Sequence, residues 1–196
     1  MAYVVTADQI GSRRSRDAVP EALGLLSAVP ALRPYERTAG DEVQGVLGSA
    51  DDVVTSALAL ARDGRWSIGI GLGPVEEPLP DMTRAGRGAA FSHAREAVEA
   101  AKRRPQRVAV RGPDEKAAAD AQAVLTLLVA VVQRRSDAAW HAADLVSAGM
   151  SMSDAATKLG VTRQAIGQRL AAGLWQQEQD ARPAVARSLA RAEASG

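Results

Sequence analysis

Apolar and polar positions along the first 110 residues alternate in two different periods. Runs that are short, apolar and β-prone predict strands at 3–7, 35–38, 43–47, 66–75 and 107–110. Runs with helical periodicity lie between them, and Gly40 and Asp41 form the turn of a hairpin. The order of strand, helix, strand, strand, helix and strand, with a further helix and strand, predicts an α+β sandwich of the ferredoxin-like kind.

Residues suited to helix termini mark several expected boundaries. Asp51 or Asp52 is expected to cap a helix that Gly64 ends, because a carboxylate accepts free N–H groups and glycine adopts left-handed dihedrals. Asp114 is expected to cap a long helix that reaches residue 134 or 135. Everything after Gly112 has a helical pattern. The sequence therefore predicts an α+β domain over 1–112 and an all-helical domain over 113–196.

The second half of the helix at 114–134 is apolar on every side, so it must be covered. One small domain provides too little cover for such a surface. The pattern therefore predicts a homodimer built partly on this helix. Burial between the two domains of a single chain is the alternative.

Composition limits the chemistry that the chain can support. Hydrophobic residues make up 46% and charged residues 24%, which is typical of a soluble globular protein, and cysteine is absent, which excludes thiol catalysis and disulfides. The most apolar run, 123–132, is too short to cross a bilayer, and no secretory signal is recognised at the N-terminus, so a cytoplasmic protein without membrane contact is expected. A net charge of +1 means that any DNA binding must rest on a local motif.

Such a motif occupies residues 153–170. Ser153 and Thr162 are expected to cap two short helices, and Gly160 supplies the left-handed turn between them. Ile166 and Leu170 are four residues apart and are expected to face inward. The outward side chains are suited to base edges in the major groove, with two further groups suited to phosphates. These expected DNA-binding residues are Thr162, Arg163, Gln164, Gly167, Gln168 and Arg169.

The alanine, glycine and isoleucine spacing of this segment resembles the helix-turn-helix modules of bacterial transcription regulators. The resemblance implies that double-stranded DNA is the partner and that a helix at 137–148 is the first helix of the module. A helical hairpin used only for packing is the alternative. The tail, 175–194, is amphipathic with Val185 and Leu189 inward, and is expected to pack or to dimerise.

Two carboxylates are candidates for a metal site in the first half. Asp8 ends the first expected strand and Asp41 lies in the hairpin turn, and the pairing of a ferredoxin-like sheet brings these positions together. Carboxylates with phosphate oxygens suit Mg²⁺. The adjacent turn offers backbone N–H groups to phosphate, from Gln9, Ile10, Gly11 and Ser12. A purely structural role for both aspartates is the alternative.

Four segments in order resemble the SatD family, which shares the fold of class III nucleotide cyclases. They are ADQIGS at 7–12, GDEVQG at 40–45, IGIGLG at 68–73 and AFSHAREAVE at 90–99. The resemblance implies that Asp8 and Asp41 bind metal, that Arg37 stands at the base-reading position and that Arg95 is the transition-state arginine. Phe91 stands where cyclases have a ribose-orienting asparagine, which argues against turnover.

Three other features have structural and functional interpretations. The glycines at 69, 71 and 73 favour close helix packing over the approach of a ligand. His93 is expected to be structural rather than catalytic. Arg13, Arg14 and Arg16 form either a solvated surface or a phosphate clamp.

The sequence therefore predicts a non-enzymatic transcription regulator, in which the first domain is a nucleotide sensor or a dimerisation scaffold. Magnesium with a nucleotide is the expected cofactor. A nucleotide-processing enzyme with an auxiliary helix-turn-helix is the alternative, and a scaffold that binds neither ligand nor DNA is a third hypothesis.

Overall fold

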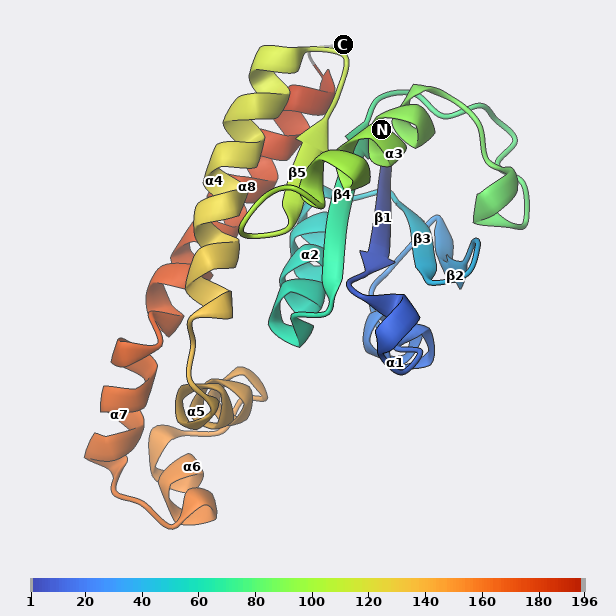
Figure 1. The fold of residues 1–196 in the computed structure, drawn as a ribbon. Coiled ribbons are helices and arrows are strands. Elements are labelled where there is room, and N and C mark those ends of the chain that lie inside the picture. Colours follow the sequence, from blue (N-terminus) through green and yellow to red (C-terminus); the bar gives the residue numbers. More distant parts are fainter. Residues whose placement is uncertain (1, 195–196) are drawn as a thin grey trace.

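A single five-stranded sheet forms the centre of the computed structural model, which describes residues 2–194 (Figure 1). The strands are β1 (Tyr3–Gln9), β2 (Arg33–Arg37), β3 (Glu42–Leu47), β4 (Trp66–Leu72) and β5 (Val108–Arg111), in the order β2-β3-β1-β4-β5. β1 is antiparallel to both of its neighbours, whereas β4 and β5 are parallel. The chain is therefore of the α+β class, as the sequence predicts.

Helices cover both faces of this sheet. They are α1 (Val19–Leu26), α2 (Ala50–Asp63), α3 (Ala89–Ala101), α4 (Glu115–Gln133) and α8 (Trp175–Ala194). Side chains of β1 alternate between the two layers, because successive residues of a strand point to opposite faces. Tyr3, Val5 and Ala7 pack in one core with α2, α4 and α8, whereas Val4 packs with α3 on the other face.

The glycines of β4 allow α3 to lie directly against the strand. A Cβ atom at Gly69 would lie 2.2 Å from the backbone nitrogen of Val98, and one at Gly71 would lie 2.0 Å from the carbonyl oxygen of Ala90. Both contacts are far below any van der Waals distance, which confirms the packing interpretation for these two positions. His93 of α3 is also structural here, since its Nδ1 lies 2.7 Å from the carbonyl oxygen of Leu72.

The expected helix caps are partly confirmed. Gly64 adopts φ +77° at the end of α2, and the Asp114 carboxylate accepts two N–H groups at the start of α4. The prediction that Asp51 or Asp52 caps α2 is wrong. Ser49 is the cap and accepts the N–H of Asp51 at 3.1 Å. Ser49, Asp51 and Asp52 are all residue types that can cap a helix. Because α2 begins at Ala50, both aspartates lie in its first turn, where their charge favours the helix N-terminus.

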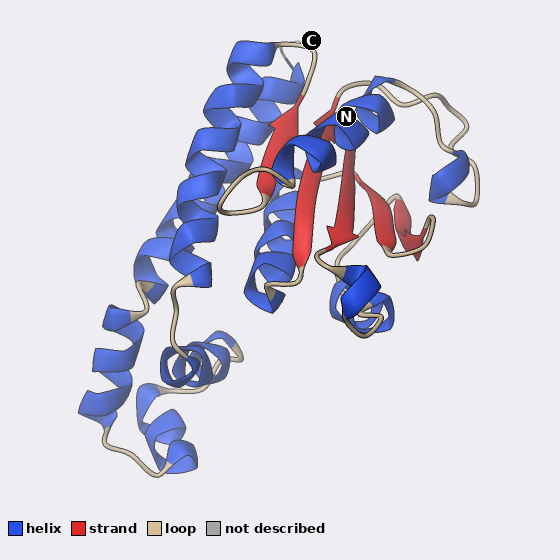
Figure 2. Cartoon of the chain, in the orientation of Figure 1, coloured by secondary structure: helices blue, strands red, loops and turns tan. Residues whose placement is uncertain are grey.

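Three shorter helices lie beyond one end of the α4–α8 pair (Figure 2). They are α5 (Asp137–Ser147), α6 (Met152–Leu159) and α7 (Arg163–Ala172). They share a small core of their own, which comprises Ala142, Ala143, Ala155, Ala156, Ile166 and Leu170. The division of the chain into domains 1–112 and 113–196 stays a prediction, and the packing places α4 and α8 in the same core as the sheet.

Buried and stacked charges connect these three helices to the rest of the chain. Arg135 Nη2 lies 2.6 Å from Glu178 Oε2, and the two side chains are only 1% and 2% exposed. The guanidinium groups of Arg62 and Arg135 both lie over the Trp140 ring, at 3.9 and 4.3 Å from its centroid. Arg62 also forms a two-bond ion pair with Asp144. Arginine contacts therefore connect α5, and the loop that precedes it, to α2 and α8.

Within residues 2–194, no helix combines the length and the apolar character needed to cross a bilayer.

Candidate functional sites

The turn between α6 and α7 is built by local capping. Gly160 adopts φ +64°, and Thr162 Oγ1 accepts the N–H of Ala165 at 3.1 Å at the start of α7, as the sequence predicts. The prediction that Ser153 caps α6 is wrong. Ser151 caps it and accepts the N–H of Asp154, because the helix begins at Met152 and Ser153 lies within its first turn.

α7 presents a polar face outward while two apolar side chains hold it in place. Ile166 is fully buried and Leu170 nearly so, against α5 and α6. Among the expected DNA-binding residues, Thr162, Arg163, Gln164 and Gln168 are exposed, and Gly167 and Arg169 are half-buried. The structure therefore brings all six onto one short segment.

Space and charge at this face both suit a polyanion. A Cβ atom added at Gly167 would meet no other atom within 4 Å, so the helix surface is open at that position. Segment 151–172 contains three basic side chains, Lys158, Arg163 and Arg169, and a single carboxylate, Asp154. A local positive field of this kind favours phosphate, although the net charge of the whole chain is only +1.

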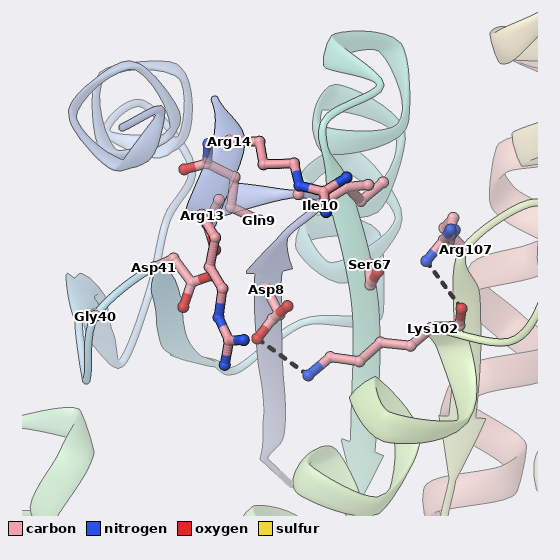
Figure 3. A pocket seen from close by; sticks show the side chains of 12 residues that line it. Asp8, Gln9, Ile10, Arg13, Arg14, Gly40, Asp41, Ser67, Lys102 and Arg107 are labelled. Carbon is pink, nitrogen blue, oxygen red and sulfur yellow. Dashed lines mark hydrogen bonds and ion pairs between the residues drawn. The ribbon is translucent and has the colours of Figure 1, made fainter. Parts of the chain in front are cut away.

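A second candidate site is a pocket of about 860 Å³ at the end of β1 (Figure 3). Asp8 and Asp41 both line it, as the sequence predicts for a shared metal site. The strand register explains their proximity, since Asp8 pairs with Glu42 and the Gln9 N–H donates to the Asp41 carbonyl at 3.1 Å. The full lining is Asp8, Gln9, Ile10, Gly11, Ser12, Arg13, Arg14, Gly40, Asp41, Ser67, Lys102 and Arg107.

Lys102 lies directly against Asp8. Its ammonium is 3.1 Å from Asp8 Oδ2 and 2.7 Å from Glu99 Oε1. Burial raises the pKa of Asp8 and the Asp41 charge adds to this, although Lys102 opposes the shift. Burial acts to lower the pKa of Lys102, but its bonds to Glu99 and Asp8 outweigh burial and raise it. Lys102 therefore stays cationic, and any metal ion at Asp8 competes with it.

Sequence reasoning missed two of the four basic side chains of this pocket, Lys102 and Arg107. Lys102 follows α3, and Arg107 precedes β5 and donates from Nη1 to the Lys102 carbonyl at 2.8 Å. Figure 3 shows the Arg13 side chain pointing toward Asp8 and Asp41. The basic cluster after β1 was a signal for Arg13 and Arg14, whereas Lys102 and Arg107 reach the pocket only through tertiary packing.

The expected backbone donors are only partly available. The N–H of Gln9 donates to Asp41, and that of Ile10 donates to the Arg65 carbonyl at 2.8 Å. The side-chain amide of Gln9 is also occupied. Its Nε2 donates to the Ser15 hydroxyl and to the Arg16 carbonyl, and its Oε1 accepts the N–H of Ala18. The expectation that the whole turn offers its N–H groups to phosphate is therefore corrected, and Gly11 and Ser12 are the residues that remain for this role.

Arg37 and Arg95 do not line this pocket. Arg37 bonds Asp17 and the Gly40 carbonyl, and it lines a smaller adjoining cavity of about 270 Å³. Its hydrogen bond holds the pKa of Asp17 below the ordinary value. Arg95 lies in a separate hollow beside α3 with three other arginines. Phe91 is buried in the core between α3 and β1, so packing accounts for the phenylalanine at that position.

Across residues 2–194, no group of three or more histidine, cysteine, aspartate or glutamate side chains is placed to hold a metal ion. Asp8 and Asp41 form a pair, so a bound Mg²⁺ would take its remaining ligands from water and phosphate oxygens.

Comparison with known proteins found no match to any protein family, curated protein or solved structure. The similarity to the SatD family and to helix-turn-helix regulators therefore stays a prediction.

Proposed function

We propose that this chain is a cytoplasmic DNA-binding transcription regulator that reads the major groove with α7. In this proposal α5, α6 and α7 form a helix-turn-helix, and the sheet with α1–α3 is a ferredoxin-like domain that senses a ligand. The observation that carries the proposal is the exposed face of α7. It places Arg163, Gln164 and Gln168 outward from a helix that Ile166 anchors to the two helices behind it.

The chemistry of this face suits direct readout of bases. A guanidinium pairs with two acceptors of guanine, and a carboxamide pairs with the donor and acceptor of adenine. Arg163 and Gln164 stand in the first turn of α7, which is the part of a recognition helix that contacts base edges. Thr162 and Arg169 are placed to hold phosphates, and Gly167 allows the helix to approach the groove closely.

Replacing Arg163 with alanine is expected to weaken specific DNA binding by about 1–3 kcal/mol, because a paired guanine would lose its partner. The binding sequence is first selected from a random duplex pool with the wild-type chain. Affinity is then measured by fluorescence anisotropy at fixed salt concentration. Arg187→Ala is the matched control, since Arg187 is an exposed arginine on α8, away from this face.

A bulky side chain at Gly167 tests the same face sterically. Gly167→Tyr is expected to keep the thermal stability of the chain, since the position is open, and to abolish binding of the selected duplex. If both Arg163→Ala and Gly167→Tyr bind the duplex as tightly as the wild type does, α7 is not the reading helix.

The pocket at Asp8 supports a second function, the binding of a phosphate-bearing ligand such as a nucleotide. Four basic side chains around two carboxylates favour an anion that brings a metal ion with it. Asp8 and Asp41 would hold Mg²⁺, which would neutralise phosphate charge. We propose binding without cyclisation, because Arg37 and Arg95 lie outside the pocket and Phe91 is in the core. A nucleotide-processing enzyme is the alternative.

Calorimetric titration with ATP, GTP and cyclic nucleotides tests this pocket. Asp41→Ala is expected to lower affinity about tenfold or more in Mg²⁺ but to have little effect in EDTA, because the lost group is a metal ligand. Asp81→Ala, an exposed aspartate elsewhere, is the control. Absence of binding by the wild type, or equal binding by Asp41→Ala, rejects the site. Formation of a cyclic product favours the enzyme instead. Any effect of the ligand on DNA affinity is bounded by the coupling free energy, typically about 1–3 kcal/mol.

A further inference from the structure

α4 buries one side and leaves an apolar stripe on the other. Leu125, Leu128, Val129 and Val132 are buried against the sheet, α2 and α8. Packing within a single chain therefore accounts for the burial of these four side chains. It does not account for Leu127, which is 70% exposed, or for Val124, which is 40% exposed.

A groove lies beside this protruding leucine. It has a volume of about 520 Å³ and runs between α4 and α8, which lie side by side in Figure 1. The α4 wall includes Val124, Leu127 and Val131, and the α8 wall includes the small residues Ala181 and Ala184. In a two-fold interface the same surface of both copies is in contact. A face that carries both an exposed leucine and a groove is complementary to itself in this way.

The charges that flank this stripe are complementary under the same two-fold operation. Asp120 and Arg134 lie seven residues on either side of Leu127, and all three are exposed. Seven residues are close to two full helical turns, so the three side chains lie on nearly the same face. Within residues 2–194, neither charged group has an ion-pair partner. Antiparallel pairing about Leu127 places each Asp120 opposite Arg134 of the partner subunit.

We propose that a second copy of this chain docks on the α4–α8 face, with the two α4 helices antiparallel and Leu127 on the two-fold axis. The two Leu127 side chains then pack against each other at the axis and beside the adjoining grooves, and the charged residues close the two ends of the contact. The proposal does not depend on DNA binding. It does fix the spacing of the two α7 helices, because α4 leads directly into α5 and α8 follows α7.

Disulfide trapping tests the axis, because the chain has no cysteine to interfere. Leu127→Cys is expected to form a covalent dimer under mild oxidation, since two side chains on the axis face one another. Ala119→Cys is the matched control. Ala119 is exposed on the same helix, but two copies of it would be about 24 Å apart along the paired helices. Equal trapping at both positions, or none at Leu127→Cys, overturns the proposal.

Light scattering of the full chain at micromolar concentration tests the interface without a crosslink. The wild type is expected to be a dimer, and Leu127→Asp is expected to raise the dimer dissociation constant roughly 30-fold or more. Asp120→Arg and Arg134→Asp should each weaken the dimer, and the double variant should restore it. A monomeric wild type, a Leu127→Asp variant that dimerises as well as the wild type, or a double variant weaker than both single variants overturns the proposal.

Discussion

Glu178→Ala is expected to lower the free energy of unfolding by about 3–5 kcal/mol, the range for breaking one side of a buried ion pair. The change leaves the Arg135 guanidinium in a site where its side chain is only 1% exposed. Arg135 keeps its bond to the Gly173 carbonyl at 2.9 Å and its contact with Trp140, but no carboxylate balances its charge. Denaturant unfolding monitored by circular dichroism measures the loss.

A second arginine provides the control for this prediction. Arg182 bonds the same carboxylate from the surface, so Arg182→Ala should cost about 1 kcal/mol or less. Replacing both buried partners, as in Arg135→Met with Glu178→Leu, should recover most of the stability, because an apolar pair has no desolvation penalty. A loss below about 1 kcal/mol for Glu178→Ala would mean that water enters and solvates Arg135.

Gly71→Ala is expected to destabilise the fold by about 3 kcal/mol or more, because the added methyl group meets backbone atoms. Its Cβ would lie 2.0 Å from the Ala90 carbonyl oxygen and 2.3 Å from the Ala94 nitrogen, so α3 has to move away from the sheet. The same unfolding measurement applies.

Gly24→Ala is the matched control for this second prediction. Gly24 lies within α1 with no atom within 4 Å of an added Cβ, so alanine there should stabilise the chain by up to about 1 kcal/mol. If Gly71→Ala is as stable as the wild type, α3 does not pack against β4 at this distance.

Local chemistry made several features predictable from the sequence. The α6–α7 turn depends on Gly160 and Thr162, which act on residues next to them in the chain. The proximity of Asp8 and Asp41 follows from the pairing of neighbouring strands, which the hairpin register determines. The period of apolar positions likewise placed Val185 and Leu189 of α8 in the core, as the structure confirms.

Features that depend on distant parts of the chain could not be predicted in this way. Lys102 reaches Asp8 only because α3 crosses the sheet, and no local pattern marks that contact. Glu178 resembles an exposed helix residue in the sequence, but it is buried beside Arg135, which lies in the loop between α4 and α5. Leu127 lies in an apolar run that predicts cover, but the sequence does not say whether that cover comes from the same chain or from a second copy. Within one chain it stays 70% exposed.

The helices α5, α6 and α7 lie in the chain between two helices of the sheet core. The chain leaves the sheet core with α4, builds α5, α6 and α7, and returns to that core with α8. The three short helices are thus an insertion between two core helices rather than a terminal appendage. Truncation after α7 would remove Val185 and Leu189 from the core, whereas excision of residues 136–173 would leave both core helices in place.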